Sequence, residues 1–106
     1  MADEQCVVTV KTLPATENKQ VTAILLCKNA FLATKELILS AARSAVGVTG
    51  TDGEVDLTLI RDAKMIDRDT GGTVPWQHSV KSDELNVDTN IVVPNSATAN
   101  FADTIQ

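Results

Sequence analysis

The chain has 106 residues, of which 43% are hydrophobic but only 3% aromatic, and its formal net charge is −5. This size and hydrophobic content fit one folded domain with an aliphatic core, and they exclude a wholly disordered chain. The acidic balance and the scarcity of aromatic side chains argue against direct binding of nucleic acid or of an anionic membrane surface.

The charge is unevenly distributed along the chain. Residues 1–47 carry four acidic and five basic residues, whereas residues 48–106 carry ten acidic and four basic residues, a net charge of −6. The acidic half suits either a basic partner surface or solubility, of which solubility is the commoner explanation. The first residues lack a basic and apolar leader pattern, and the longest apolar run, residues 23–27, is too short to cross a bilayer. We therefore expect a cytoplasmic protein.

The strand pattern is clearest at the start of the chain. Residues 6–13, CVVTVKTL, are rich in β-branched residues and predict a strand. Residues 20–27, QVTAILLC, fit either a second strand or the start of a long helix capped by Thr16. We favour a hairpin of two strands, because both apolar runs have strand length. A symmetric pairing would place Cys6 opposite Cys27, close to bridging distance, although free thiols are the usual state in a reducing compartment.

A helix is predicted over residues 29–46. Asn29 can cap its first turn and Gly47 can close its end. Ile38 lies on a broad apolar face, opposite a polar stripe spaced at three and four residues. This face should pack on a sheet of the same domain.

The second half of the chain predicts three further strands. Residues 54–66, 73–80 and 85–93 alternate between apolar and polar side chains, and turn-forming residues at 67–72 and 81–84 separate them. The resulting order is strand, strand, helix, strand, strand, strand.

These elements predict the α+β class, with one amphipathic helix packed on a mainly antiparallel sheet of about five strands. Residues 1–93 would form the single domain. From Pro94 the composition turns polar, so residues 94–106 should form a mobile tail unless Phe101 and Ile105 dock.

Three neighbouring residues are the best candidates for an interface. Pro75 lacks an amide donor and marks residues 73–80 as an edge or bulged strand. Trp76 beside it is of a type enriched at binding hot spots, but it could equally anchor the core. His78 shares the strand face with Trp76, where a packing or interface role is commoner than acid–base catalysis.

No motif indicates a metal or a cofactor. Asp67 and Asp69 precede two glycines, but the later ligand positions of a calcium loop are missing, so a solvated turn is the better interpretation. The turn at 51–54 likewise fixes no geometry between its carboxylates. Two cysteines and one histidine are too few for a Cys/His zinc site within one chain. Glycine-rich phosphate loops are absent from the sequence.

These observations favour a non-enzymatic binding or assembly module with a protein partner. The leading hypothesis is a self-associating structural subunit, a homo-oligomer of a microbial or phage-like assembly. One alternative is an acidic inhibitor or regulatory protein that binds a basic partner surface. A second alternative is a small enzyme whose site at an oligomer interface involves His78.

Overall fold

The computed structural model describes residues 4–27, 30–32, 34, 38, 43–74 and 77–105. These residues are mostly β-strand, with one short α-helix near the C-terminus. The strands are β1 (Gln5–Lys11), β2 (Gln20–Leu25), β3 (Ala30–Leu32), β4 (Ser44–Val48), β5 (Glu54–Ile60), β6 (Met65–Asp67), β7 (His78–Ser82), β8 (Val87–Ile91) and β9 (Thr98–Asn100), and the helix is α1 (Phe101–Thr104).

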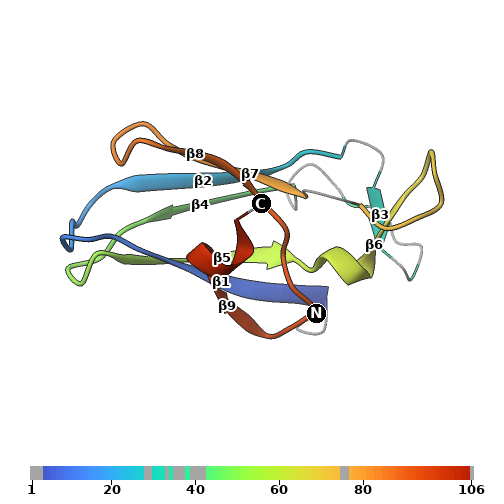
Figure 1. Ribbon diagram of the computed structural model, residues 1–106, viewed down its shortest axis with the longest axis horizontal. Coiled ribbons are helices and arrows are strands. Elements are labelled where there is room, and N and C mark those ends of the chain that lie inside the picture. The colour runs from blue at the N-terminus through green and yellow to red at the C-terminus, as the bar shows by residue number, and fades with distance from the viewer. Residues whose placement is uncertain are drawn as a thin grey trace.

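Two stacked sheets form the body of the molecule. One sheet has the strand order β5-β1-β9 and the other has the order β4-β2-β7-β8. Neighbouring strands are antiparallel except β1 and β9, which are parallel. Figure 1 shows β1 and β5 forming one layer and β2, β4, β7 and β8 the other, along a molecule that measures 42 × 24 × 23 Å. The fold is therefore an elongated β-sandwich.

The core lies between the two layers and is aliphatic. In β1, Cys6, Val8 and Val10 are buried, while the residues between them are more exposed. The apolar residues of β5 alternate in the same way, and Val8 pairs with Leu57. The whole cluster comprises Cys6, Val8, Val10, Val21, Ala23, Val55, Leu57, Leu59, Val80, Ile91 and Val93. Period-two alternation thus gives each sheet one apolar face, and burial of the two faces against each other stabilises the sandwich.

A second cluster fills one end of the molecule. There the two-stranded ribbon β3–β6 lies beyond the sandwich (Figure 1). The buried residues of this cluster are Leu25, Ala30, Leu32, Ile38, Ile60, Met65 and Val74. Leu25 and Ile60 end β2 and β5, so this cluster begins where the sandwich core ends.

The predicted helix over residues 29–46 is wrong at both of its ends. Ala30–Leu32 forms β3, and Ser44–Val48 forms β4; most of the residues between them lie outside the described residues. Gly47, which was expected to close the helix, lies within β4. A side chain there would collide with Val55, so glycine allows β4 to lie close to β5. The α+β prediction is accordingly corrected to a mostly sheet fold.

The strand interpretation of residues 20–27 is confirmed by β2, but the predicted hairpin is wrong. β1 and β2 belong to different sheets, so their apolar residues face each other across the core instead of lying side by side. Cys6 pairs with Leu59, not with Cys27, and both thiols are free.

The later strands are shorter than expected. The predicted strand 54–66 divides into β5, a 3-10 turn at Asp62–Lys64, and β6. Residues 73–80 were expected to form an edge strand, but β7 begins at His78 and lies between β2 and β8. That prediction is wrong for the described part, because β8 supplies a second neighbour.

Part of the polar tail is folded onto the sandwich. β9 pairs with β1, and Phe101 of α1 packs against the sandwich core. Ile105 forms a bridge with Ile91. A mobile tail was expected unless Phe101 and Ile105 dock, and both residues make such contacts. In the part of the chain that the structure describes, no helix has the length and hydrophobicity needed to cross a membrane.

Candidate functional site

The structure places only one of the three sequence-predicted site residues. His78 opens β7, pairs with Leu25 and Ile91, and is 1% exposed. Its Nδ1 atom has no hydrogen-bond partner among the described residues, and burial lowers the pKa of His78 from 6.5 to about 4. The imidazole is therefore neutral and enclosed in the isolated chain. Pro75 and Trp76 lie outside the described residues.

Polar groups beside His78 join the sandwich to its end cluster. The buried amide of Gln77 donates from Nε2 to the carbonyl of Val74 at 3.3 Å and accepts at Oε1 from the amide of Val93 at 2.9 Å. Asp62 also hydrogen-bonds Gln77 through its side chain, and burial raises the pKa of Asp62. These contacts satisfy both ends of the Gln77 amide, which is typical of a structural junction.

Carboxylates at the two sequence-predicted turns make local contacts. Asp67 Oδ1 accepts from the amide of Asp69 at 2.9 Å, and Asp52 Oδ1 accepts from the amide of Glu54 at 3.0 Å. Both are ordinary turn contacts, which confirms the turn interpretation. Among the described residues, no three His, Cys, Asp or Glu side chains gather as metal ligands would.

The most unusual surface of the described structure is the edge formed by β4. This strand ends its sheet and pairs with β2 alone among the described strands. Its bonded positions follow from the flanking contacts, because the Arg43 carbonyl accepts from Leu25 and the Thr49 amide donates to Lys19. In an antiparallel pair the bonded positions alternate, so odd-numbered residues of β4 face β2.

The even-numbered residues of β4 point their backbone groups away from the sheet. These residues are Ser44, Val46 and Val48, and their N–H and C=O groups lie along the free edge. The side chains of Val46 and Val48 are 58% and 53% exposed. Ile24 of β2, on the same outer face, is 46% exposed. The edge therefore combines backbone groups that have no strand partner among the described residues with exposed aliphatic side chains.

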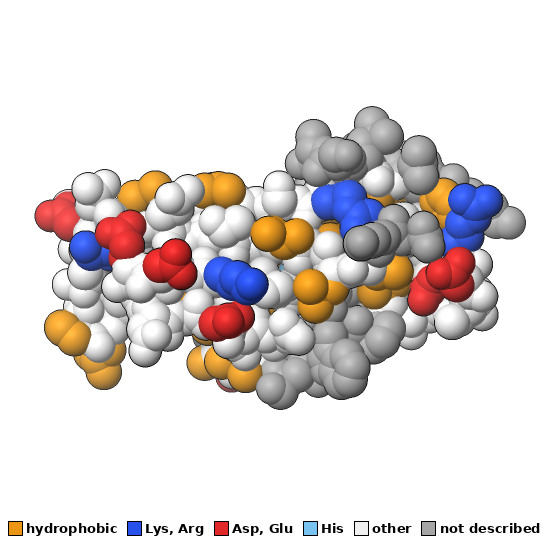
Figure 2. Space-filling view, turned by 90° about the horizontal axis from the view of Figure 1, so that it is seen from above, with side chains coloured by type: hydrophobic (Ala, Val, Ile, Leu, Met, Phe, Trp, Pro, Cys, Tyr) orange, Lys and Arg blue, Asp and Glu red, His pale blue; other side chains and the backbone are white. Residues whose placement is uncertain are grey.

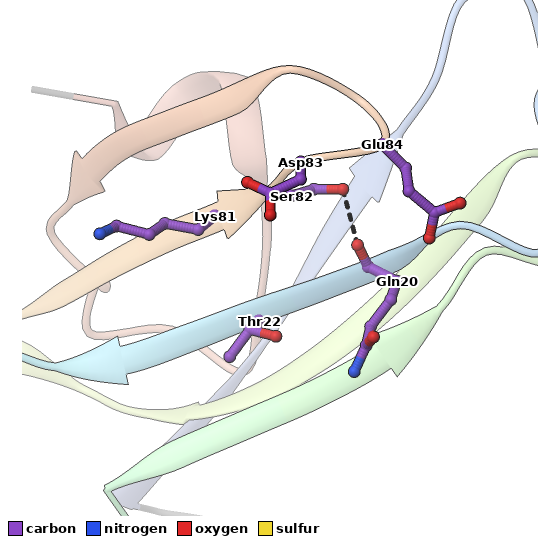
Figure 3. Close-up of a pocket in the computed structure, with 6 residues that line it drawn as sticks. All are labelled: Gln20, Thr22, Lys81, Ser82, Asp83 and Glu84. Atoms are coloured by element: carbon purple, nitrogen blue, oxygen red, sulfur yellow. Dashed lines mark hydrogen bonds between the residues drawn. The ribbon is translucent and has the colours of Figure 1, made fainter.

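A polar hollow lies on the same outer face, between β2 and the turn that joins β7 to β8. Its volume is about 290 Å³, and it is lined by Gln20, Thr22, Lys81, Ser82, Asp83 and Glu84. The Ser82 hydroxyl donates to the carbonyl of Gln20 at 2.6 Å, which fastens the turn to β2 (Figure 3). Lys19 pairs with Glu84 at 3.3 Å. Figure 2 shows acidic side chains toward this end of the molecule and hydrophobic side chains in separate patches.

The hollow and the free edge form one surface. Gln20 pairs with Val48, and Thr22 pairs with Val46, so the β2 side of the hollow lies directly beside the exposed valines. A partner that pairs with β4 would thus meet aliphatic side chains first and polar groups further across the sheet.

This surface was not expected from the sequence, because residues 44–46 were predicted to end a helix that Gly47 would close. The segment Ser-Ala-Val-Gly-Val carries a signal that could have located it: two valines at alternate positions around a glycine, a pattern that favours a strand over a helix.

No protein-family model and no curated protein sequence matches the chain.

Proposed function

We propose that the chain is a non-enzymatic binding or assembly module whose β4 edge accepts a strand from a protein partner. Such an edge would suit a structural subunit of a microbial or phage-like assembly. The observation that supports this proposal is the composition of β4: an edge strand of five residues with no charge and with two valines more than half exposed.

The other sheet edges of the sandwich carry features that oppose strand addition. β5 carries Glu54 and Asp56, and β8 carries Asp88. β9 has only three residues. Proteins commonly protect edge strands from association with charged side chains and short length. β4 lacks both devices, so it is the edge of the sandwich best suited to pairing.

The chemistry of strand addition fits the geometry of this edge. Ser44, Val46 and Val48 each present one donor and one acceptor to an incoming strand, and main-chain hydrogen bonds of this kind supply affinity. The side chains of Val46 and Val48 supply the aliphatic contact beside them. No catalytic group is needed for this function.

The test is a titration of the isotopically labelled chain with a short, extended probe peptide of alternating threonine and valine, followed by NMR. Pairing at β4 should slow deuterium exchange at the amides of Val46 and Val48, which face outward. The amide of Gly47, which already faces β2, should change little. Protection confined to β5 or β8, or no change with millimolar peptide, would contradict the proposal.

A second candidate function is binding of a basic partner surface by the turn between β7 and β8. Asp83 and Glu84 are exposed in this turn, and Asp88 is exposed nearby on β8. Exposed acidic groups attract basic surfaces in a salt-dependent manner. Replacing Asp83 and Asp88 with asparagine should then weaken binding of a basic model protein such as a lysine-rich polypeptide, whereas Val46→Lys should not.

A further inference from the structure

We propose that the partner at the β4 edge is a second copy of this chain, and that the two β4 strands pair antiparallel about a two-fold axis beside Val46. This inference rests on the proposed function and specifies its partner. The paired copies would share one continuous eight-stranded sheet, in the order β8-β7-β2-β4-β4-β2-β7-β8, with each four-stranded half as observed.

The register follows from the positions of the free backbone groups. Only Ser44, Val46 and Val48 present N–H and C=O groups to the edge, so a good register must pair these residues with one another. Placing Val46 opposite Val46 of the other copy also places Ser44 of each copy opposite Val48 of the other. Every free group in the strand then has a partner. A shift by two residues leaves one residue at each end unpaired.

The side chains are compatible with this arrangement. On the outer face, Val46 would meet Val46 of the other copy, and each Val48 would meet a serine, so exposed aliphatic surface is buried. On the inner face, Ala45 and Gly47 are small, which allows the β4 edges of the two sandwiches to approach each other. The pattern is self-complementary, as an isologous contact requires.

Charge also favours a second copy over a charged peptide. β4 contributes no charge to the contact, so two identical edges meet without a pair of like charges opposite each other. Repulsion between the two copies comes from the net charge of −5 on each chain, and salt screens it over about 8–10 Å. Self-association should therefore strengthen as ionic strength rises.

The first test is sedimentation velocity of the full chain from micromolar to millimolar concentration, in low and moderate salt. A monomer–dimer equilibrium is expected. Val46→Lys should weaken it by at least about tenfold, because two lysines would then lie opposite each other at the centre of the pair. Asn90→Lys is the matched control, since Asn90 is exposed on the outer face of β8 at the opposite edge. It should leave the equilibrium unchanged.

The second test measures the register by disulfide trapping, with Cys27 replaced by serine in every variant. Val46→Cys should cross-link two copies on mild oxidation, because directly opposed residues have Cα atoms about 5.5 Å apart. Val48→Cys should not, because the two copies of that residue lie about 13 Å apart along the strands. Combining Ser44→Cys with Val48→Cys should restore the cross-link.

The outcomes separate this inference from the function on which it rests. A chain that stays monomeric at millimolar concentration, yet protects Val46 and Val48 when the probe peptide is added, would overturn the second copy as partner and leave strand addition standing. A dimer that tolerates Val46→Lys, with circular dichroism showing an intact fold, would overturn the β4 contact. Cross-linking through Val48→Cys alone would overturn the register.

Discussion

Gly47 in β4 lies so close to Val55 in β5 that a Cβ atom on Gly47 would overlap Cγ2 of Val55. The same Cβ would lie 3.3 Å from Cδ2 of Leu57. This contact joins the edge strands of the two sheets on one side of the sandwich. It holds the proposed binding edge against the core, although the edge itself faces outward.

Gly47→Ala should therefore destabilise the fold by about 1–3 kcal/mol, since added volume in a packed site forces its neighbours to shift. The measurement is urea denaturation at pH 7. Gly72→Ala serves as the control, because a Cβ there would meet only Thr70 Oγ1, at 3.8 Å. Equal stability of the two variants would show that β4 and β5 can separate without cost.

Two glycines in different turns, Gly53 before β5 and Gly71 after β6, have nearly the same backbone conformation. Gly53 has φ +76° and Gly71 has φ +74°. A Cβ on Gly53 would lie 2.7 Å from Cα of Ala15 and 2.9 Å from the amide of Thr16, whereas a Cβ on Gly71 would meet nothing within 4 Å.

Gly71→Ala should lower the free energy of unfolding by about 1–2 kcal/mol, because alanine would have to adopt the left-handed conformation. Gly53→Ala should lower the free energy of unfolding by that amount and by about 1–3 kcal/mol more, because the added Cβ is crowded by its neighbours. Thermal and urea unfolding of both variants would measure the difference. A Gly53→Ala variant as stable as Gly71→Ala would show that the loop at residues 12–16 can shift to accommodate the added Cβ without loss of stability.

Burial of His78 predicts a pH-dependent stability. Its pKa is lowered to about 4 in the folded chain from 6.5, so between these values the unfolded chain binds the proton more readily. The contribution of the neutral imidazole to the free energy of unfolding should be fully present above about pH 6.5. It should fall as the pH drops toward 4 and then level off. The full loss is roughly 3 kcal/mol.

His78→Leu should remove this slope, as urea denaturation at half-unit steps of pH would show. The raised pKa of Asp62 acts in the opposite direction, because the folded chain then holds that proton more tightly and gains stability on acidification. The variant should thus reveal any contribution from Asp62. A slope that is unchanged by His78→Leu would contradict the burial of the neutral imidazole.

The C-terminal segment should contribute measurably to stability. Phe101 is partly buried against the sandwich core, and the carbonyl of Thr104 accepts from the amide of Val92 at 3.0 Å. Phe101→Ala should cost about 2 kcal/mol, less than the 3–5 kcal/mol typical of a fully buried phenylalanine. Ile105→Ala, at a side chain that is 45% exposed, should change stability by less than about 0.5 kcal/mol. Equal effects would show that Phe101 does not pack as described.

Local patterns in the sequence identified β1, β2 and β5, because each has the alternation that one buried face imposes. Their partners could not be deduced in this way. Val8 pairs with Leu57, which is distant in the chain, and nothing local specifies that choice. Two consecutive apolar strands fit a hairpin and two facing sheets equally well, and only the whole set of apolar faces distinguishes these arrangements.

The candidate site was missed for a related reason. Apolar residues over 29–46 are dense enough to fit a helical period, and Val46 fell within that predicted helix. Pairing of β4 with β2 outweighs that local preference, as tertiary contacts commonly do. Trp76 and Pro75 were chosen for residue type and for their place on a predicted edge strand, and an interface role for them stays a prediction.

The parallel pairing of β1 with β9 has a mechanical consequence. Val7, Val8 and Thr9 lie beside Thr98, Ala99 and Asn100 with the two strands running in the same direction. Hydrogen bonds in such a pair lie across the strands. Tension that pulls the start of β1 away from the end of β9 would act along the strands, so it would load these bonds together in shear instead of opening them one after another. A chain held in this way would resist stretching more strongly than one whose terminal strands could unzip.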